Sequence, residues 1–205
     1  IVEAIRNARV IVDNIRKVIY YLISTSISEI VLISATVFFG LPLPLLPIQI
    51  LWVNLVTDGV QDKTFPFIRE EGNVMNRPPK DPAKQFFDGR QMRRILTFGL
   101  VMGSLAAVMF WYLLGCYPYG LSVSIMFTSF VCFQWFNGLQ AQLEHEPFLL
   151  DIKKSLTINP YIFHGIGTGL VLQLVAIYAI PGVFGIVPLA FEHWGYVGML
   201  SLAAF

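Results

Sequence analysis

The stretch IQILWVNLVTDGVQDK, residues 48–63, places polar residues inside an apolar run and decides how the chain folds. The run is apolar enough for a membrane span, yet it contains two carboxylates and an amide. Its polar residues after Trp52 are Asn54, Thr57, Asp58, Gln61, Asp62 and Lys63. A charge at mid-bilayer costs roughly 2.5–3.5 kcal/mol on insertion scales, so such residues normally face a bundle interior and mark an ion path.

The composition of the 205-residue chain is typical of a membrane protein. Hydrophobic residues make up 56% and charged residues 13%, and the mean hydropathy is +0.66. A typical soluble domain is about one-quarter charged, so the composition argues against a soluble fold. The amphipathic, charged N-terminal stretch does not resemble a cleavable signal, and without an initiator Met the chain is expected to be part of a longer protein.

Six apolar segments are predicted to span the membrane as an all-α bundle of three helical hairpins. Each span needs about 20 residues at about 1.5 Å rise per residue. Residues 1–14 are expected to form a cytoplasmic stalk, followed by a C-terminal transmembrane domain over 15–205. The expected spans lie near residues 15–39, 46–63, 92–114, 121–142, 160–180 and 190–205.

Basic residues alternate with uncharged turns along the chain. All 14 Lys and Arg lie in three groups, and the turns at 40–47, 115–121 and 181–193 contain none. The positive-inside rule therefore predicts that the N-terminus and the long polar loop 64–91 are cytoplasmic. This loop carries RPPKDP at 77–82 and is expected to be ordered and extended rather than helical.

Several polar residues in different spans are expected to converge. Ser26 lies three residues before Glu29, and Asn54 lies four before Asp58, so each pair shares a helical face. Counted from the span ends, Glu29, Asp58 and Gln134 all fall near mid-depth. These side chains offer only oxygen ligands, and Ca²⁺ takes about six to eight of them. A soft-metal site is disfavoured.

Some of these polar residues have a simpler alternative role. Ser26, Thr57 and Asn137 could only hydrogen-bond neighbouring helices or their own backbone carbonyls. Asp62 and Lys63 lie near the end of their span, where they could extend to the interface or pair with each other.

The sequence resembles the calcium-pump branch of P-type cation-transporting ATPases. IQILWVNLVTDG at 48–59, followed by NVMNRPPKDP at 73–82, is similar to the sixth transmembrane helix and the loop after it. YLISTSISE at 21–29 resembles helix five, and FTSFVCFQWFNGLQ at 127–140 resembles helix eight. The resemblance runs along the whole chain and implies helices five to ten of such a pump.

The resemblance implies a set of ion ligands in this chain. Ser26 stands where the two-calcium pumps have an amide, and Gln134 stands where they have an acid. Both changes weaken the same one of the two family sites, so one ion per cycle is expected. VQDKTFPF at 60–67 also departs from the family pattern. The implied metal ligands are Ser26, Glu29, Asn54, Thr57, Asp58 and Gln134.

By this resemblance the chain is the C-terminal membrane domain of an ATP-driven cation pump, most simply for Ca²⁺, in a plasma or inner membrane. Its expected partners are the lipid bilayer, the pump headpiece and helices one to four, with no nucleic acid. ATP and Mg²⁺ would act only through the missing cytoplasmic domains, so the chain alone would be inactive. The alternatives are a truncated or accessory six-span protein without transport, or the same domain for Na⁺, H⁺ or Mn²⁺.

Overall fold

The computed structural model describes residues 1–70, 72, 74–76, 87–143 and 156–202. All regular elements in these residues are helical, with no strand among them. Four helical segments are long and apolar enough to cross a membrane: Val2–Phe38, Gly89–Cys116, Tyr119–Ala141 and Ile162–Ala179. The prediction of an all-α chain with several apolar spans is therefore confirmed.

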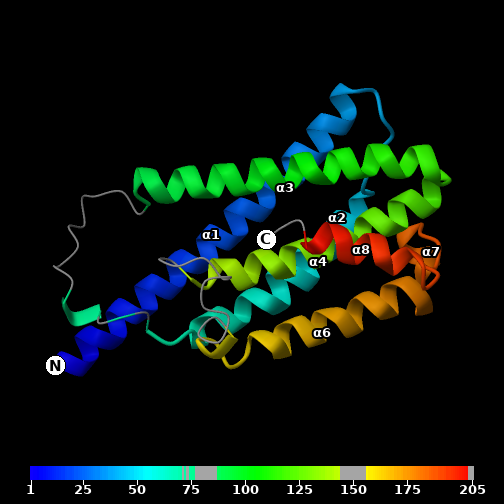
Figure 1. Cartoon of the computed structure of the whole chain (residues 1–205). Helices are drawn as coiled ribbons and strands as arrows, with labels where there is room; N and C mark the ends of the chain where they lie inside the picture. Colours follow the sequence, from blue (N-terminus) through cyan, green and yellow to red (C-terminus); the bar gives the residue numbers. More distant parts are fainter. Residues whose placement is uncertain (71, 73, 77–86, 144–155, 203–205) are drawn as a thin grey trace.

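The helices alternate in direction, so the uncharged turns collect at one end of the bundle (Figure 1). The chain reaches this end three times and turns back each time, as expected for hairpins. The α-helices are α1 (Val2–Phe38), α2 (Pro47–Val56), α3 (Gly89–Cys116), α4 (Tyr119–Ala141), α6 (Ile162–Leu174), α7 (Pro181–Phe184) and α8 (His193–Leu202).

Two of the six predicted spans are not among these four segments. In the span predicted at 46–63, α2 ends at Val56, and a π-helical turn (Thr57–Gln61) and a 3₁₀ helix (Asp62–Phe67) follow. In the span predicted at 190–205, α8 has ten residues, and 203–205 lie outside the described residues. The count of six spans is therefore not established.

The polar loop predicted at 64–91 begins in helical conformation, because the 3₁₀ helix continues past Lys63 to Phe67. A second short 3₁₀ helix covers Val74–Asn76, and α6 ends in a π-helical turn (Val175–Ala179). The RPPKDP segment, which we expected to be extended, lies outside the described residues.

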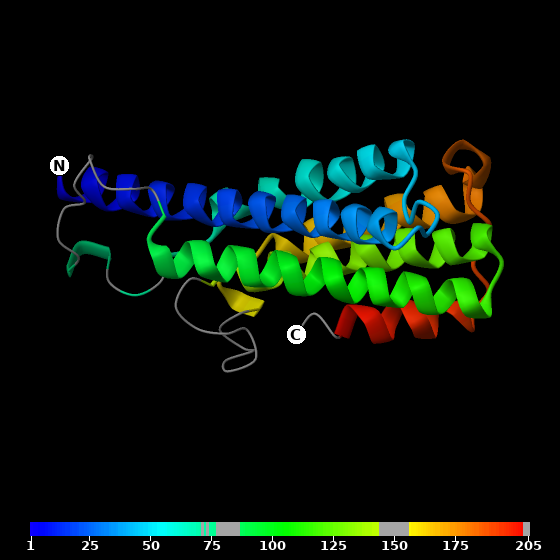
Figure 2. The same cartoon turned by 90° about the horizontal axis from the view of Figure 1, so that it is seen from above.

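α1 is the longest element, with 37 residues. At about 1.5 Å per residue it is roughly 55 Å long, whereas the hydrocarbon core of a bilayer is about 30 Å thick. α3 lies beside it along much of its length (Figure 2). α1 therefore extends well beyond a single membrane crossing.

α1 and α3 pack closely because α3 presents two glycines to α1. A Cβ on Gly103 would lie 2.6 Å from the backbone oxygen of Ser28, and one on Gly99 would lie 2.6 Å from Ile27 Cγ2. Small residues four apart are a common device for close helix packing in membranes, where apolar burial alone does not drive helices together.

α4 is the central helix of the bundle. Nearly all of its residues are buried, including Phe127, Phe130 and Phe133, and it contacts α1, α2, α3, α6 and α8. A helix that is apolar on all sides belongs in a core. The polar residues of α4 are therefore held at the centre of the molecule.

We predict that Gly103→Ala lowers the free energy of unfolding by about 1–3 kcal/mol, because the added methyl overpacks the contact with α1. Gly115→Ala is the matched control, since a Cβ there has nothing within 4 Å. Alanine favours helix over glycine by about 1 kcal/mol, so the control should be neutral or stabilising. Denaturation in one detergent measures both variants. Equal effects would contradict the close α1–α3 contact.

Candidate cation site

The centre of the candidate site is a contact between α1 and α4. Glu29 on α1 is 9% exposed and Gln134 on α4 is fully buried. Gln134 Nε2 donates a hydrogen bond to Glu29 Oε1 at 3.2 Å. A buried carboxylate is costly unless it is hydrogen-bonded or binds a cation. The structure thus brings together two of the predicted ligands from residues 105 positions apart in the chain.

Buried hydroxyls precede Glu29 on α1, and they donate to backbone carbonyls of their own helix. Ser24 Oγ lies 2.9 Å from the Tyr21 oxygen, Thr25 Oγ1 2.9 Å from the Leu22 oxygen, and Ser28 Oγ 2.7 Å from the Thr25 oxygen. Such bonds consume the hydroxyl proton. The oxygen lone pairs stay available as acceptors inside the bundle.

The predicted ligands of the second span lie where its helix changes pitch. Asn54 is half-buried on α2, and Thr57 and Asp58 begin the π-helical turn (Thr57–Gln61). The wider turn displaces the residues that follow it from the α-helical register. π-Helical turns occur often at functional sites. The structure describes the backbone of Thr57 and Asp58 but not their side chains.

Ser26 is exposed on α1, whereas Glu29 is buried. Ser26 takes no part in the contact between Glu29 and Gln134. The i, i+3 spacing places Ser26 and Glu29 on one face of α1. Among the described residues, α4 covers this face at Glu29 but leaves Ser26 exposed.

Sequence comparison identifies the family of this bundle. The family described as "Cation transporting ATPase, C-terminus" matches residues 42–205. The chain belongs to this family. The match includes the helical break at Thr57 and the Gln134 position, and it begins after α1.

A named relative extends the match to α1. The calcium-transporting ATPase of Bacillus subtilis (strain 168) is 31% identical over 208 residues. The alignment covers 99% of this chain but 23% of the relative. This ATPase C-terminal chain therefore spans about a quarter of the length of that relative.

Gln61, at the end of the π-helical turn, links this turn to α1 and α4 in the membrane bundle. It is fully buried. Tyr21 Oη donates to Gln61 Oε1 at 3.3 Å, and Gln61 Nε2 donates to the Trp135 carbonyl at 3.1 Å. Gln61 therefore bonds the π-helical turn to α1 and α4, which are the helices that carry Glu29 and Gln134.

Gly138 leaves room for the Gln61 side chain on α4. A Cβ at this position would lie 2.1 Å from Gln61 Nε2, closer than any non-bonded contact allows. The next segment is held as well, because Thr64 Oγ1 donates to the Gln61 carbonyl at 2.7 Å and Asn159 Nδ2 donates to the Thr64 carbonyl at 3.2 Å.

Among the described residues no salt bridge joins the side chains of Asp62 and Lys63, although the backbone N–H and the charge of Lys63 both act on the Asp62 carboxylate. Lys63 is exposed and Asp62 is half-buried. The sequence left two alternatives, pairing of these residues or extension to the interface, and the exposed Lys63 agrees with extension to the interface.

The sequence analysis did not assign Gln61 or Ser24 to the site, and it left Asn137 outside the implied ligands, with hydrogen bonding to neighbouring helices as its alternative role. A usable signal was present for Asn137, because two amides three residues apart on an otherwise apolar helix share one face. The Gln61 contacts had no comparable signal, since they depend on the pitch change of its helix.

A polar seam joins the start of α1 to the segment after the 3₁₀ helix. Arg6 Nε donates to Glu70 Oε2 at 2.8 Å, and a second bond joins Arg6 Nη2 to Glu70 Oε1. Arg9 Nη1 donates to the Val74 carbonyl at 2.7 Å, and Asn14 Nδ2 donates to the Ile68 carbonyl at 3.0 Å. The bundle end that carries the basic residues is thus tied to α1.

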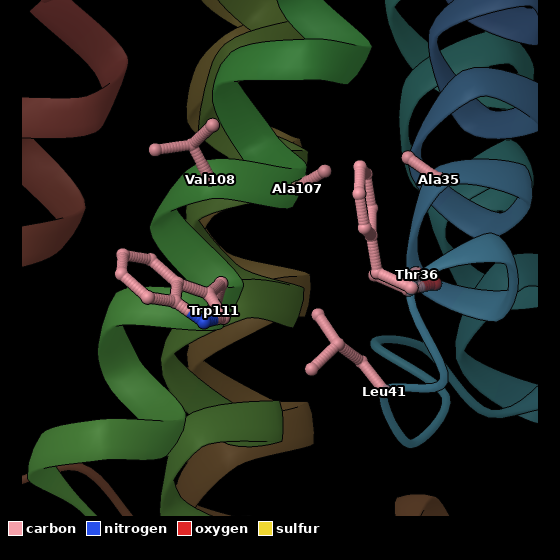
Figure 3. Close-up of a pocket in the computed structure, with 7 residues that line it drawn as sticks. Ala35, Thr36, Leu41, Ala107, Val108 and Trp111 are labelled. Carbon is pink, nitrogen blue, oxygen red and sulfur yellow. The ribbon is translucent and has the colours of Figure 1, made fainter.

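An apolar pocket of about 350 Å³ lies elsewhere, between the end of α1 and α3 (Figure 3). Ala107 on α3 points toward Ala35 on α1, and Leu41 lies near the opening between them. Thr36 is its one hydroxyl residue, and that hydroxyl donates to Ile33 and Leu32 carbonyls. The pocket therefore lacks the oxygen ligands that a cation needs.

We predict that Gly138→Ala lowers the free energy of unfolding by about 1–3 kcal/mol, because the methyl displaces the Gln61 side chain. In a Gln61→Ala background the same change should cost little, since the clashing atoms are gone. A double-mutant cycle in denaturant measures this coupling. Gly120→Ala, on the same helix with ordinary contacts, is the control. Additive effects would contradict the contact.

A pH dependence follows from the Arg6–Glu70 pair. Hydrogen bonding from Arg6, and then its charge, lower the pKa of Glu70. The pair therefore stabilises the fold above the ordinary glutamate pKa of about 4.3, and this contribution is lost as pH falls through the lowered value. The melting temperatures of wild type and Glu70→Gln should differ at pH 7, and the difference should shrink as the pH falls below the ordinary glutamate pKa. A constant difference would exclude the linkage.

Proposed function

We propose that this chain is the ion-binding membrane domain of an ATP-driven pump and that it binds Ca²⁺ as the transported substrate. Glu29 and Asp58 would supply the two charged oxygen ligands. Neutral oxygens would come from Asn54, Thr57, Ser26 and Gln134. The hydrogen-bonded contact of Glu29 with Gln134, beside a helix that breaks at Thr57, carries this proposal.

The chemistry of the ligand set supports a hard cation. Carboxylate, amide and hydroxyl oxygens are the ligands that Ca²⁺ prefers, and Ca²⁺ accepts them in flexible arrangements. The B. subtilis relative is named as a calcium-transporting ATPase. With a neutral amide at Gln134 and a hydroxyl at Ser26, the set favours one ion per cycle. Na⁺, H⁺ and Mn²⁺ are the competing substrates.

The chain covers only 23% of the B. subtilis relative, so we also propose how the rest of such a pump would contact this domain. The exposed Ser26 face of α1 would be covered by membrane helices outside this chain. The polar seam between α1 and Glu70 would transmit movement from a cytoplasmic headpiece that binds ATP and Mg²⁺. In this orientation the basic end of the bundle faces the cytoplasm of a plasma or inner membrane.

The test uses the full-length gene product in lipid vesicles, with Ca²⁺-dependent ATP hydrolysis and Ca²⁺ uptake as readouts. We expect Glu29→Gln and Asp58→Asn each to weaken the apparent Ca²⁺ affinity at least about tenfold, which corresponds to about 1.4 kcal/mol for one charged ligand. Glu192→Gln is the control, because that side chain is 79% exposed and lies at the turn end of the bundle, away from the candidate site.

The outcomes separate the candidate functions. Wild-type protein without ion-stimulated ATP hydrolysis would indicate the accessory role. Stimulation of ATP hydrolysis by Na⁺, Mn²⁺ or a pH gradient in place of Ca²⁺ would assign a different transported ion to the same site. Unchanged affinity in both the Glu29 and Asp58 variants would contradict the ligand assignment.

A further inference from the structure

Two buried amides on α4 face α1 and are each oriented by a residue there. Gln134 and Asn137 are three residues apart and fully buried. Gln134 Nε2 donates to Glu29, and Asn137 Nδ2 donates to Ser24 Oγ at 2.8 Å. Because α1 and α4 are antiparallel, the Ser24–Asn137 contact lies on the side of Glu29 nearer the basic end of the bundle.

The orientation of each amide is fixed by its partner. The Ser24 hydroxyl donates its proton to the Tyr21 carbonyl, so its oxygen can only accept from Asn137. An ionised Glu29 also can only accept. Both amides must therefore turn their N–H groups toward α1 and their carbonyl oxygens elsewhere.

Both carbonyl oxygens are buried without a hydrogen-bond partner among the described residues, Gln134 Oε1 and Asn137 Oδ1 alike. Leaving such a buried group unpaired is costly, so unpaired carbonyl oxygens are uncommon in protein interiors. The unpaired Trp135 Nε1 lies between them in sequence but faces α6, since a Cβ on Gly169 would lie 3.1 Å from it. The α1–α4 contact thus holds oriented acceptors.

We infer that Asn137 is a further ligand of the transported cation, through Oδ1, and that it forms with Gln134 a neutral position beside Glu29. Oriented acceptors without donors suit a hard cation such as Ca²⁺. An ion arriving from the basic end would meet Asn137 and exchange part of its water before it reaches the Glu29 carboxylate. Ser24 is the positioning residue. This inference rests on the proposed function.

Equilibrium binding of ⁴⁵Ca²⁺ to the full-length gene product in lipid nanodiscs tests the inference. We expect Asn137→Leu to weaken binding about tenfold and Ser24→Ala to weaken it less, because the freed amide keeps its oxygen. Asn137→Asp should tighten binding and make it more dependent on pH, since the new carboxylate must lose a proton. Ser129→Ala is the matched control, because Ser129 Oγ is also buried on α4 without a partner among the described residues.

The variants also separate this inference from the proposed function. If Glu29→Gln weakens binding while Asn137→Leu and Asn137→Asp leave both affinity and pH dependence unchanged, Asn137 is a packing residue and the inference is wrong. If Glu29→Gln and Asp58→Asn also have no effect, the ligand assignment of the proposed function fails as well. Should Asn137→Leu not fold, Asn137→Asp alone decides, because it keeps the size and the hydrogen-bonding oxygen of the side chain.

Discussion

The buried carboxylate of Glu29 is the interaction on which the centre of this bundle depends. In a low-dielectric interior a carboxylate needs donors or a cation, and Gln134 on α4 donates a hydrogen bond to Glu29. The contact fixes the depth of α1 relative to α4. Gly99 and Gly103 then set how closely α3 can approach the same helix. One polar contact and one close glycine contact therefore position α1 on two sides, although most of the bundle surface is apolar.

The same interior must also accommodate a helix that changes pitch twice. A backbone that leaves α-helical geometry inside a membrane protein needs neighbours that accept or supply hydrogen bonds. Gln61 and Thr64 meet this need, since they connect the π-helical turn and the 3₁₀ helix to Tyr21, Trp135 and Asn159. Conformational irregularity at Thr57 and Asp58 is thus supported by a buried hydrogen-bond network rather than by flexibility.

The sequence predicted the parts of this structure that depend on composition and periodicity. Apolar runs gave the helical bundle, uncharged turns gave its common end, and depth counting brought Glu29 close to Gln134. Periodicity does not report pitch, so the break after Val56 was not predicted. It also does not report which face is covered, so exposed Ser26 and buried Ser24 were not distinguished. The spacing of Gly99 and Gly103 carried packing information that hydropathy alone omits.

α1 connects two regions that are far apart in the bundle. Arg6 and Glu29 are 23 residues apart on one continuous helix, which is about 35 Å at 1.5 Å per residue. Near its start the helix is bonded to the segment around Glu70, and 23 residues later it carries the central carboxylate. A shift of the Glu70 segment along the helix axis therefore cannot be absorbed by a loop between these two points. Such a shift would strain the hydrogen bonds at Arg6, Arg9 and Asn14 or the contact of Glu29 with Gln134, and this continuity is the physical basis on which we propose that movement is transmitted.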